Sequence, residues 1–124
     1  MVPGADSERF TVAVRTVDGA VVVELAGELD HDTAQPLRDV LESSVPAGGL
    51  LLVDLTDLGF CDSTGLNVLL HGRLTAQEAG AGLELVGLHG SVARMFRITG
   101  ADGVFPVHAD VAAALGEPGP ADPP

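Results

Sequence analysis

The sequence has no tryptophan, no tyrosine and no lysine, and it contains one cysteine and four phenylalanines in 124 residues. Without aromatic platforms for stacking, the chain does not suit single-stranded nucleic acid or an aromatic cage, and its core must be aliphatic. The single cysteine, Cys61, cannot form an internal disulfide, which favours a reducing cytoplasm. No signal peptide and no apolar run of membrane-spanning length is recognisable.

Positive charge is also scarce, because six arginines face 18 acidic residues and the net charge is -12. Nucleic acid and anionic membrane surfaces are therefore not expected partners, whereas a protein that presents basic side chains is. The four histidines show no pair at metal-ligand spacing, so we expect no metal site and no cofactor. They are His31, His71, His89 and His108.

The chain is long enough for one compact domain, since 46% of its residues are hydrophobic. Residues 1–8 are expected to form a flexible leader, and residues 116–124 are too rich in proline and glycine to pack. The domain is therefore predicted over residues 9–115. With the apolar positions used in its core, a monomer is the expected state.

A β-hairpin is predicted at the start of this domain. Apolar and polar residues alternate over residues 10–16, Asp18-Gly19 is a tight-turn pair, and residues 20–25 form the returning strand. Asp32 or Thr33 can then cap a surface helix, which Pro46 and the glycines at 48–49 would end. The apolar face of this helix comprises Leu37, Val40, Leu41 and Val45.

Strands and helices alternate in the rest of the domain. Residues 50–55 are nearly all apolar, as in a strand covered on both faces. Helices are predicted over residues 66–74, 91–100 and 110–115, and Ser91 is expected to cap the second of them. Strands are predicted over residues 83–86 and 104–107. The prediction is a single layered α/β domain with a mixed sheet, whose sites gather at the carboxyl ends of the parallel strands.

One such end carries the segment Phe60-Cys61-Asp62-Ser63-Thr64-Gly65-Leu66, between the buried strand and the next helix. A serine at a helix N-terminus exposes a hydroxyl, and a phosphate placed there meets free backbone N–H groups and the positive end of the helix dipole. A phosphate added to Ser63 would therefore be stabilised by this end of the helix. The alternative role of Ser63 is that of an ordinary helix N-cap.

Three segments together resemble the STAS domain of bacterial anti-sigma-factor antagonists: Gly27–His31 (GELDH), the strand that ends in Asp54-Leu55, and Phe60–Leu66. The resemblance covers roughly residues 10–115, the size of a small domain, and implies the STAS fold. It also implies that Ser63 is phosphorylated by an anti-sigma factor with a histidine-kinase-like ATPase fold and serine-kinase activity. The unphosphorylated antagonist would bind this factor and free a sigma factor, and a serine phosphatase would reset the phosphorylated form.

The resemblance assigns partner contacts to the segments around the acceptor, at Asp30, His31, Asp62, Ser63, Thr64, Gly65 and Asn67. Asp62 can position the acceptor hydroxyl or a metal bound to the kinase, or it can only stabilise the helix dipole. Thr64 is either structural or a second acceptor, and Gly65 is expected to permit close packing at the helix entrance. Asn67 departs from the small residue that the family pattern favours, and Cys61 is expected to be an apolar filler in the loop before Ser63.

Enzyme classes fit the sequence poorly, so we expect no catalytic activity. Asp62-Ser63-Thr64-Gly65 is one residue longer than an aspartic-protease D-[ST]-G signature, and Ser63 lacks the glycine of a hydrolase elbow. A receiver domain uses a lysine near its phosphorylated aspartate, and the chain has none. The remaining alternative is a STAS-like scaffold or nucleotide-sensing module that is not phosphorylated.

Overall fold

The computed structural model describes residues 9–44 and 49–116. Their five strands form one mixed sheet in the order β1-β2-β3-β4-β5, in which β1 is antiparallel to β2 and the other neighbours are parallel. The strands are β1 (Phe10–Val17), β2 (Ala20–Leu29), β3 (Leu50–Cys61), β4 (Gly82–Val86) and β5 (Val107–His108). The helices are α2 (Ala34–Ser43), α3 (Ser63–Glu78), α4 (Gly90–Thr99) and α5 (Val111–Ala114). The predicted α/β class with an N-terminal hairpin is confirmed.

The hairpin turn forms where the sequence predicted it. Val17 pairs with Ala20, and the two turn residues, Asp18 and Gly19, both have positive φ, of 50° and 85°. Such a turn matches the twist of the two strands, and aspartate followed by glycine is a favoured pair for it. The hairpin thus follows from local chemistry alone.

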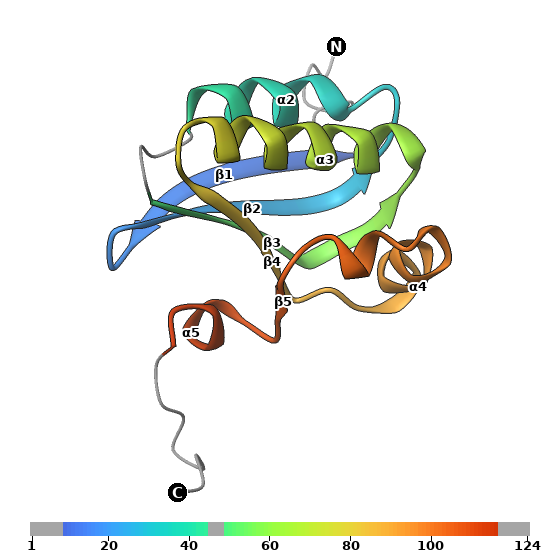
Figure 1. The fold of residues 1–124 in the computed structure, drawn as a ribbon. Coiled ribbons are helices and arrows are strands. Elements are labelled where there is room, and N and C mark those ends of the chain that lie inside the picture. The colour runs from blue at the N-terminus through green and yellow to red at the C-terminus, as the bar shows by residue number, and fades with distance from the viewer. Residues whose placement is uncertain (1–8, 45–48, 117–124) are drawn as a thin grey trace, which may run out of the picture.

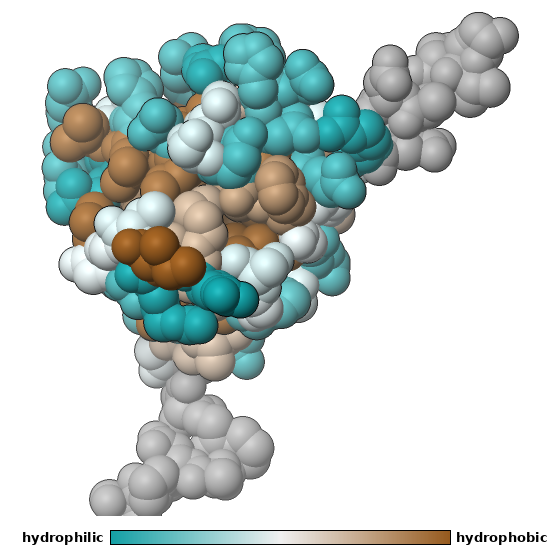
Figure 2. All heavy atoms as spheres, turned by 90° about the vertical axis from the view of Figure 1, so that its right-hand side faces the viewer, coloured by the Kyte–Doolittle hydropathy of each residue, from teal (hydrophilic) through white to brown (hydrophobic). Residues whose placement is uncertain are grey.

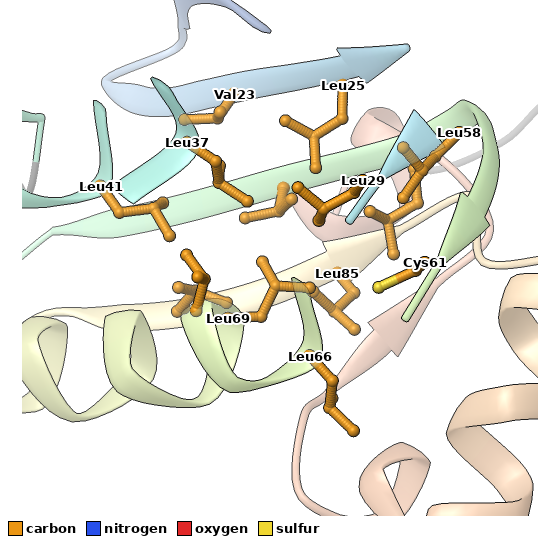
Figure 3. Packing of buried hydrophobic residues seen from close by; sticks show 14 of the residues in the cluster. Val23, Leu25, Leu29, Leu37, Leu41, Leu58, Cys61, Leu66, Leu69 and Leu85 are labelled. Atoms are coloured by element: carbon orange, nitrogen blue, oxygen red, sulfur yellow. The ribbon is translucent and has the colours of Figure 1, made fainter. Parts of the chain in front are cut away.

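The sheet is covered on both faces, as the apolar run in β3 predicted (Figure 1). Helices α2 and α3 lie side by side on one face, where Val23, Leu37 and Leu69 belong to the main core (Figure 3). A smaller cluster on the other face contains Leu52 and Val86 and packs against Val111 of α5. Helix α4 lies beside the C-terminal end of β3 (Figure 1).

Three strands differ from the prediction. Strand β2, predicted over residues 20–25, continues to Leu29. Strand β3 ends at Cys61 rather than near Leu55, because its pairing with β2 continues that far. The pairing includes two register shifts on β2, between Glu24 and Ala26 and between Gly27 and Glu28. The last strand was predicted over 104–107 but comprises only Val107–His108. A 3₁₀ turn, η1 (Ala101–Gly103), directly follows α4 and occupies the chain up to Val104.

The predicted helix caps need correction as well. Thr33 precedes α2, but its hydroxyl donates to the Glu28 carbonyl (2.8 Å) and makes no capping bond to the helix. Ser91 is the second residue of α4, and His89 occupies the N-cap position instead. The Ser91 Oγ donates to the Gly59 carbonyl at 3.2 Å. Gly100 ends α4 with φ 80°, as expected. The predicted leader (residues 1–8), residues 117–124 of the predicted tail, Val45 of the predicted helix face, and Pro46 and Gly48 of the predicted helix stop lie outside the described residues.

Candidate functional site at the ends of strands β2 and β3

The two segments that the sequence singled out meet at one edge of the sheet. Leu29 and Cys61, the last residues of β2 and β3, are register partners, and the Asp62 N–H donates to the Leu29 carbonyl at 3.1 Å. Asp30 and Asp62 therefore directly follow two parallel strands, β2 and β3, which are neighbours in the sheet (Figure 1). The carboxyl end of a parallel sheet is where ligand and partner sites commonly form.

Asp62, not Ser63, caps helix α3. The Asp62 backbone is extended, and its Oδ1 accepts a hydrogen bond from the Gly65 N–H at 3.0 Å. Ser63 is the first residue of the helix, its side chain is exposed, and its hydroxyl has no hydrogen-bond partner among residues 9–44 and 49–116. Because the capping bond belongs to Asp62, the Ser63 hydroxyl is free to react.

The Asp30 carboxylate holds the neighbouring loop in one conformation. Its Oδ1 accepts from the Asp32 N–H (2.9 Å) and the Thr33 N–H (3.2 Å), while Oδ2 pairs with the Arg9 guanidinium. Burial raises the pKa of this carboxyl, but the Asp32 hydrogen bond and Arg9 outweigh burial and hold the pKa below its ordinary value. Asp30 is thus an ionised, structurally engaged residue at the border of the site.

Replacing Asp30 by asparagine is expected to lower the urea midpoint at neutral pH. Because the folded-state pKa is depressed, the carboxylate stabilises the fold above its unfolded pKa of about 3.9 and loses this effect as the pH falls through the lower folded value. The variant should therefore lose less stability than wild type between neutral and strongly acidic pH. The control is Asp32→Asn, whose carboxylate is exposed. Parallel pH curves for Asp30→Asn and wild type would exclude this role.

The start of α3 packs tightly against both strand ends, which explains Gly65. A Cβ at this position would lie 2.6 Å from Leu29 Cγ and 2.9 Å from Cys61 Sγ. Figure 3 shows Leu29 near Cys61 at this end of the core, with Leu66 on the adjoining start of α3. The expected close packing at Gly65 is confirmed, and it fixes where Ser63 lies relative to the sheet.

The other predicted contact residues differ in exposure. His31 and Asn67 are exposed and Thr64 is half-buried. Asn67 lies one helical turn beyond Ser63 and lines a shallow hollow between α2 and α3 with Arg38 and Glu42. His31 and Asn67 are therefore accessible at the surface, whereas Gly65 is buried.

Cys61 was predicted in a loop, but it is the last residue of β3 and is buried. Its role as an apolar filler is confirmed. Burial, with a smaller contribution from Asp62, raises the pKa of the thiol to about 12.

The Cys61 thiol is expected to react very slowly with a thiol-specific disulfide reagent in the folded protein. At mildly alkaline pH the thiolate fraction should be about a thousandfold lower than in the unfolded chain, where the pKa is about 8.5. Labelling rates with and without concentrated urea measure this difference. Equal rates in the two conditions would contradict the buried position of the thiol.

Two residues of this region escaped the sequence prediction. Arg9 pairs with Asp30 and, at 3.5 Å, with Glu28, a contact between residues distant in the chain. Phe60, noted from the sequence only as the first residue of the Ser63 segment, is 46% exposed. The signal available in the sequence was the scarcity of aromatic residues, four in the whole chain.

No group of histidine, cysteine or acidic side chains suited to a metal ion occurs within the described ranges. Among the helices of those same ranges, none combines the length and the apolar character needed to cross a membrane.

Comparisons with known proteins agree with this fold. A family model described as "Mlab, STAS domain" matches residues 12–108. The anti-sigma-B factor antagonist of Bacillus subtilis is 32% identical over 100 residues, covering 81% of this chain and 92% of that protein. The Listeria monocytogenes protein of the same name is 34% identical over 84 residues, 67% of this chain and 74% of that one.

A solved structure has the same architecture. The crystal structure of an anti-sigma factor antagonist from Mycobacterium paratuberculosis matches with a TM-score of 0.77 and 29% identity, covering 86% of this chain and 92% of that chain. The protein belongs to the STAS-domain family of anti-sigma-factor antagonists. The resemblance stated from the sequence is confirmed.

Proposed function

We propose that this protein is an anti-sigma-factor antagonist that acts by partner switching in the cytoplasm. The unphosphorylated form binds an anti-sigma factor with serine-kinase activity and so releases a sigma factor; phosphorylation of Ser63 abolishes that binding, and a serine phosphatase restores it. The names of the relatives support the antagonist role. The observation that carries the acceptor assignment is the exposed Ser63 hydroxyl at the first position of α3, which has no hydrogen-bond partner among the residues that the structure describes.

The backbone around Ser63 can accommodate both the free hydroxyl and a phosphate attached to it. In the first turn, the Gly65 N–H bonds to the Asp62 carboxylate and the Leu66 N–H to the Asp62 carbonyl. The N–H groups of Ser63 and Thr64 have no acceptor among the described residues and are available to a phosphate. Each such contact contributes about 0.3–1 kcal/mol at an exposed helix end, so the phosphorylated form remains folded.

The surface that the anti-sigma factor would cover follows from the position of Ser63. Asp30, His31 and Asp62 border the acceptor on the strand side, and Thr64 and Asn67 continue the surface along α3. Its acidic residues favour a partner with basic side chains near the kinase active site. Gly65 contributes by holding α3 against the sheet rather than by contact.

Phosphorylation can be tested by intact-mass analysis with phosphopeptide mapping, after incubation with ATP and an extract of the host that contains the kinase. Wild type should gain one phosphate, about 80 Da, at Ser63. Ser63→Ala should gain none, and Thr64→Ala, the control, should behave as wild type. A wild-type protein that stays unmodified by an active kinase would refute the switch and favour a scaffold or nucleotide-sensing module.

A further inference from the structure

Helix α4 is a basic element in an acidic protein. It contains Arg94 and Arg97, two of the six arginines, and no acidic residue, whereas the chain as a whole has a net charge of -12. Both arginines are exposed, and neither forms an ion pair within the part of the chain that the structure describes. Unpaired positive charge on one short helix therefore stands out from the surrounding surface.

Apolar side chains accompany this charge. Ile98, one turn beyond Arg94, is 74% exposed, the largest value among the exposed large hydrophobic residues of the described chain. Phe60 follows Gly59, whose carbonyl accepts the Ser91 hydroxyl at the start of α4. Figure 2 shows the end of the molecule where α4 lies, with apolar surface in its middle and hydrophilic residues around it. We call Phe60, Arg94, Arg97 and Ile98 the α4 surface.

The α4 surface is continuous with the acceptor site. Phe60 belongs to the same segment as Ser63, separated from it only by Cys61 and Asp62. The hydrogen bond from Ser91 to Gly59 fixes the N-terminus of α4 to this segment. A protein that reaches the Ser63 hydroxyl is thus brought next to Phe60 and α4.

We propose that the α4 surface is a second contact area for the anti-sigma factor and that it receives an acidic and apolar region of that partner. This inference rests on the proposed function. A second copy of the chain fits poorly, because a symmetric contact through α4 would bring the arginines of both copies together. Two arginines in so acidic a chain are also too few for nucleic acid or an anionic membrane.

The charge pattern gives this surface a specific role. The acceptor side of the interface is acidic, because Asp62 adds to Asp30 and Glu28, two carboxylates that share the single Arg9, and the α4 side is basic through Arg94 and Arg97. A partner with the opposite pattern satisfies both sides in only one orientation, which directs its kinase site to Ser63. The α4 surface therefore contributes to both affinity and the choice of acceptor.

The test measures binding of the purified anti-sigma factor of the same host to unphosphorylated protein by calorimetry. The double variant Arg94→Glu/Arg97→Glu and the single variant Ile98→Ser are each expected to weaken binding about 10-fold or more. The matched controls are Arg73→Glu, on α3, and Val14→Ser, an apolar residue 48% exposed on β1. Both controls should stay within about twofold of wild type, and thermal unfolding of all variants should match wild type, because Arg94, Arg97, Ile98 and Val14 are exposed and Arg73 is only half-buried.

The outcomes separate the two proposals. If wild type binds and Ser63→Asp weakens binding, while the α4 variants bind as wild type does, the α4 inference is wrong and the proposed function stands. A loss of affinity in the controls as large as in the α4 variants would also overturn the inference. If wild type does not bind the purified factor at all, the proposed function itself fails.

Discussion

Phosphorylation of Ser63 is expected to weaken binding of the anti-sigma factor by about 100-fold or more. The phosphate adds about -1.5 to -2 charge at a position already next to Asp62 and near the segment of Asp30. Arg9 already pairs with both Asp30 and Glu28, so its positive charge is balanced before the phosphate is added. In a packed interface, the dianion faces both repulsion from nearby carboxylates and the cost of losing its hydration.

Charge alone need not account for the whole effect. A complete change from bound to released requires about 5.5 kcal/mol of differential binding, more than an exposed charge pair supplies. The phosphate also occupies the space where a partner would contact the exposed first turn of α3. We therefore expect Ser63→Asp, which adds a smaller and singly charged group, to weaken binding less than phosphorylation does.

Calorimetric titration of the anti-sigma factor with four forms of the protein measures these effects: wild type, phosphorylated wild type, Ser63→Asp and Ser63→Ala. The alanine variant is the control and should bind as tightly as wild type, because the Ser63 hydroxyl makes no hydrogen bond within the described chain. Equal affinity of the phosphorylated and unphosphorylated proteins would refute phosphorylation as the switch.

Replacement of Gly27 by alanine is expected to cost more than about 3 kcal/mol of unfolding free energy. Gly27 lies in the bulged part of β2 with φ 97°, and a Cβ there would meet the Arg9 carbonyl oxygen at 2.0 Å. Backbone atoms cannot move aside as a flexible side chain can. The same Arg9 carbonyl accepts from the Glu28 N–H at 2.7 Å, so the change also disturbs the anchor of the Arg9–Asp30 pair.

Gly19→Ala provides the matched control for this prediction. Gly19 has a similar φ of 85°, but a Cβ there would have no atom within 4 Å. It should therefore show only the cost of a positive φ, about 1–2 kcal/mol. Urea denaturation of both variants isolates the steric part at Gly27, and equal losses of stability would show that the close approach to Arg9 has no consequence.

Local chemistry explains which parts of this fold are predictable from the sequence. The Asp18-Gly19 turn and the Gly100 helix end depend on backbone preferences of the residues themselves. The length of β3 depends instead on bulged pairing with β2, and the polar residues Asp54 and Asp57 obscure it. Elements set by contacts between distant segments are the ones that the sequence pattern misses.

In the candidate site, too, the sequence predicts the local motif but not the contacts between distant residues. The motif around Ser63 identifies the segment, but aspartate and serine are both good N-cap residues, so the pattern does not distinguish Asp62 from Ser63 as the cap. The geometry at Gly65 resolves this, because its N–H bonds to Asp62. The link between Arg9 and Asp30 was beyond prediction, since nothing near either residue in the sequence indicates the other.

The most direct test of partner switching measures the release of a sigma factor. A preformed complex of the sigma factor with the anti-sigma factor is titrated with unphosphorylated protein, and free sigma factor is quantified by size-exclusion chromatography. Unphosphorylated wild type should displace the sigma factor, and the form phosphorylated at Ser63 should displace little or none at the same concentration. Failure of the unphosphorylated protein to displace it, or equal displacement by both forms, would contradict partner switching controlled at Ser63.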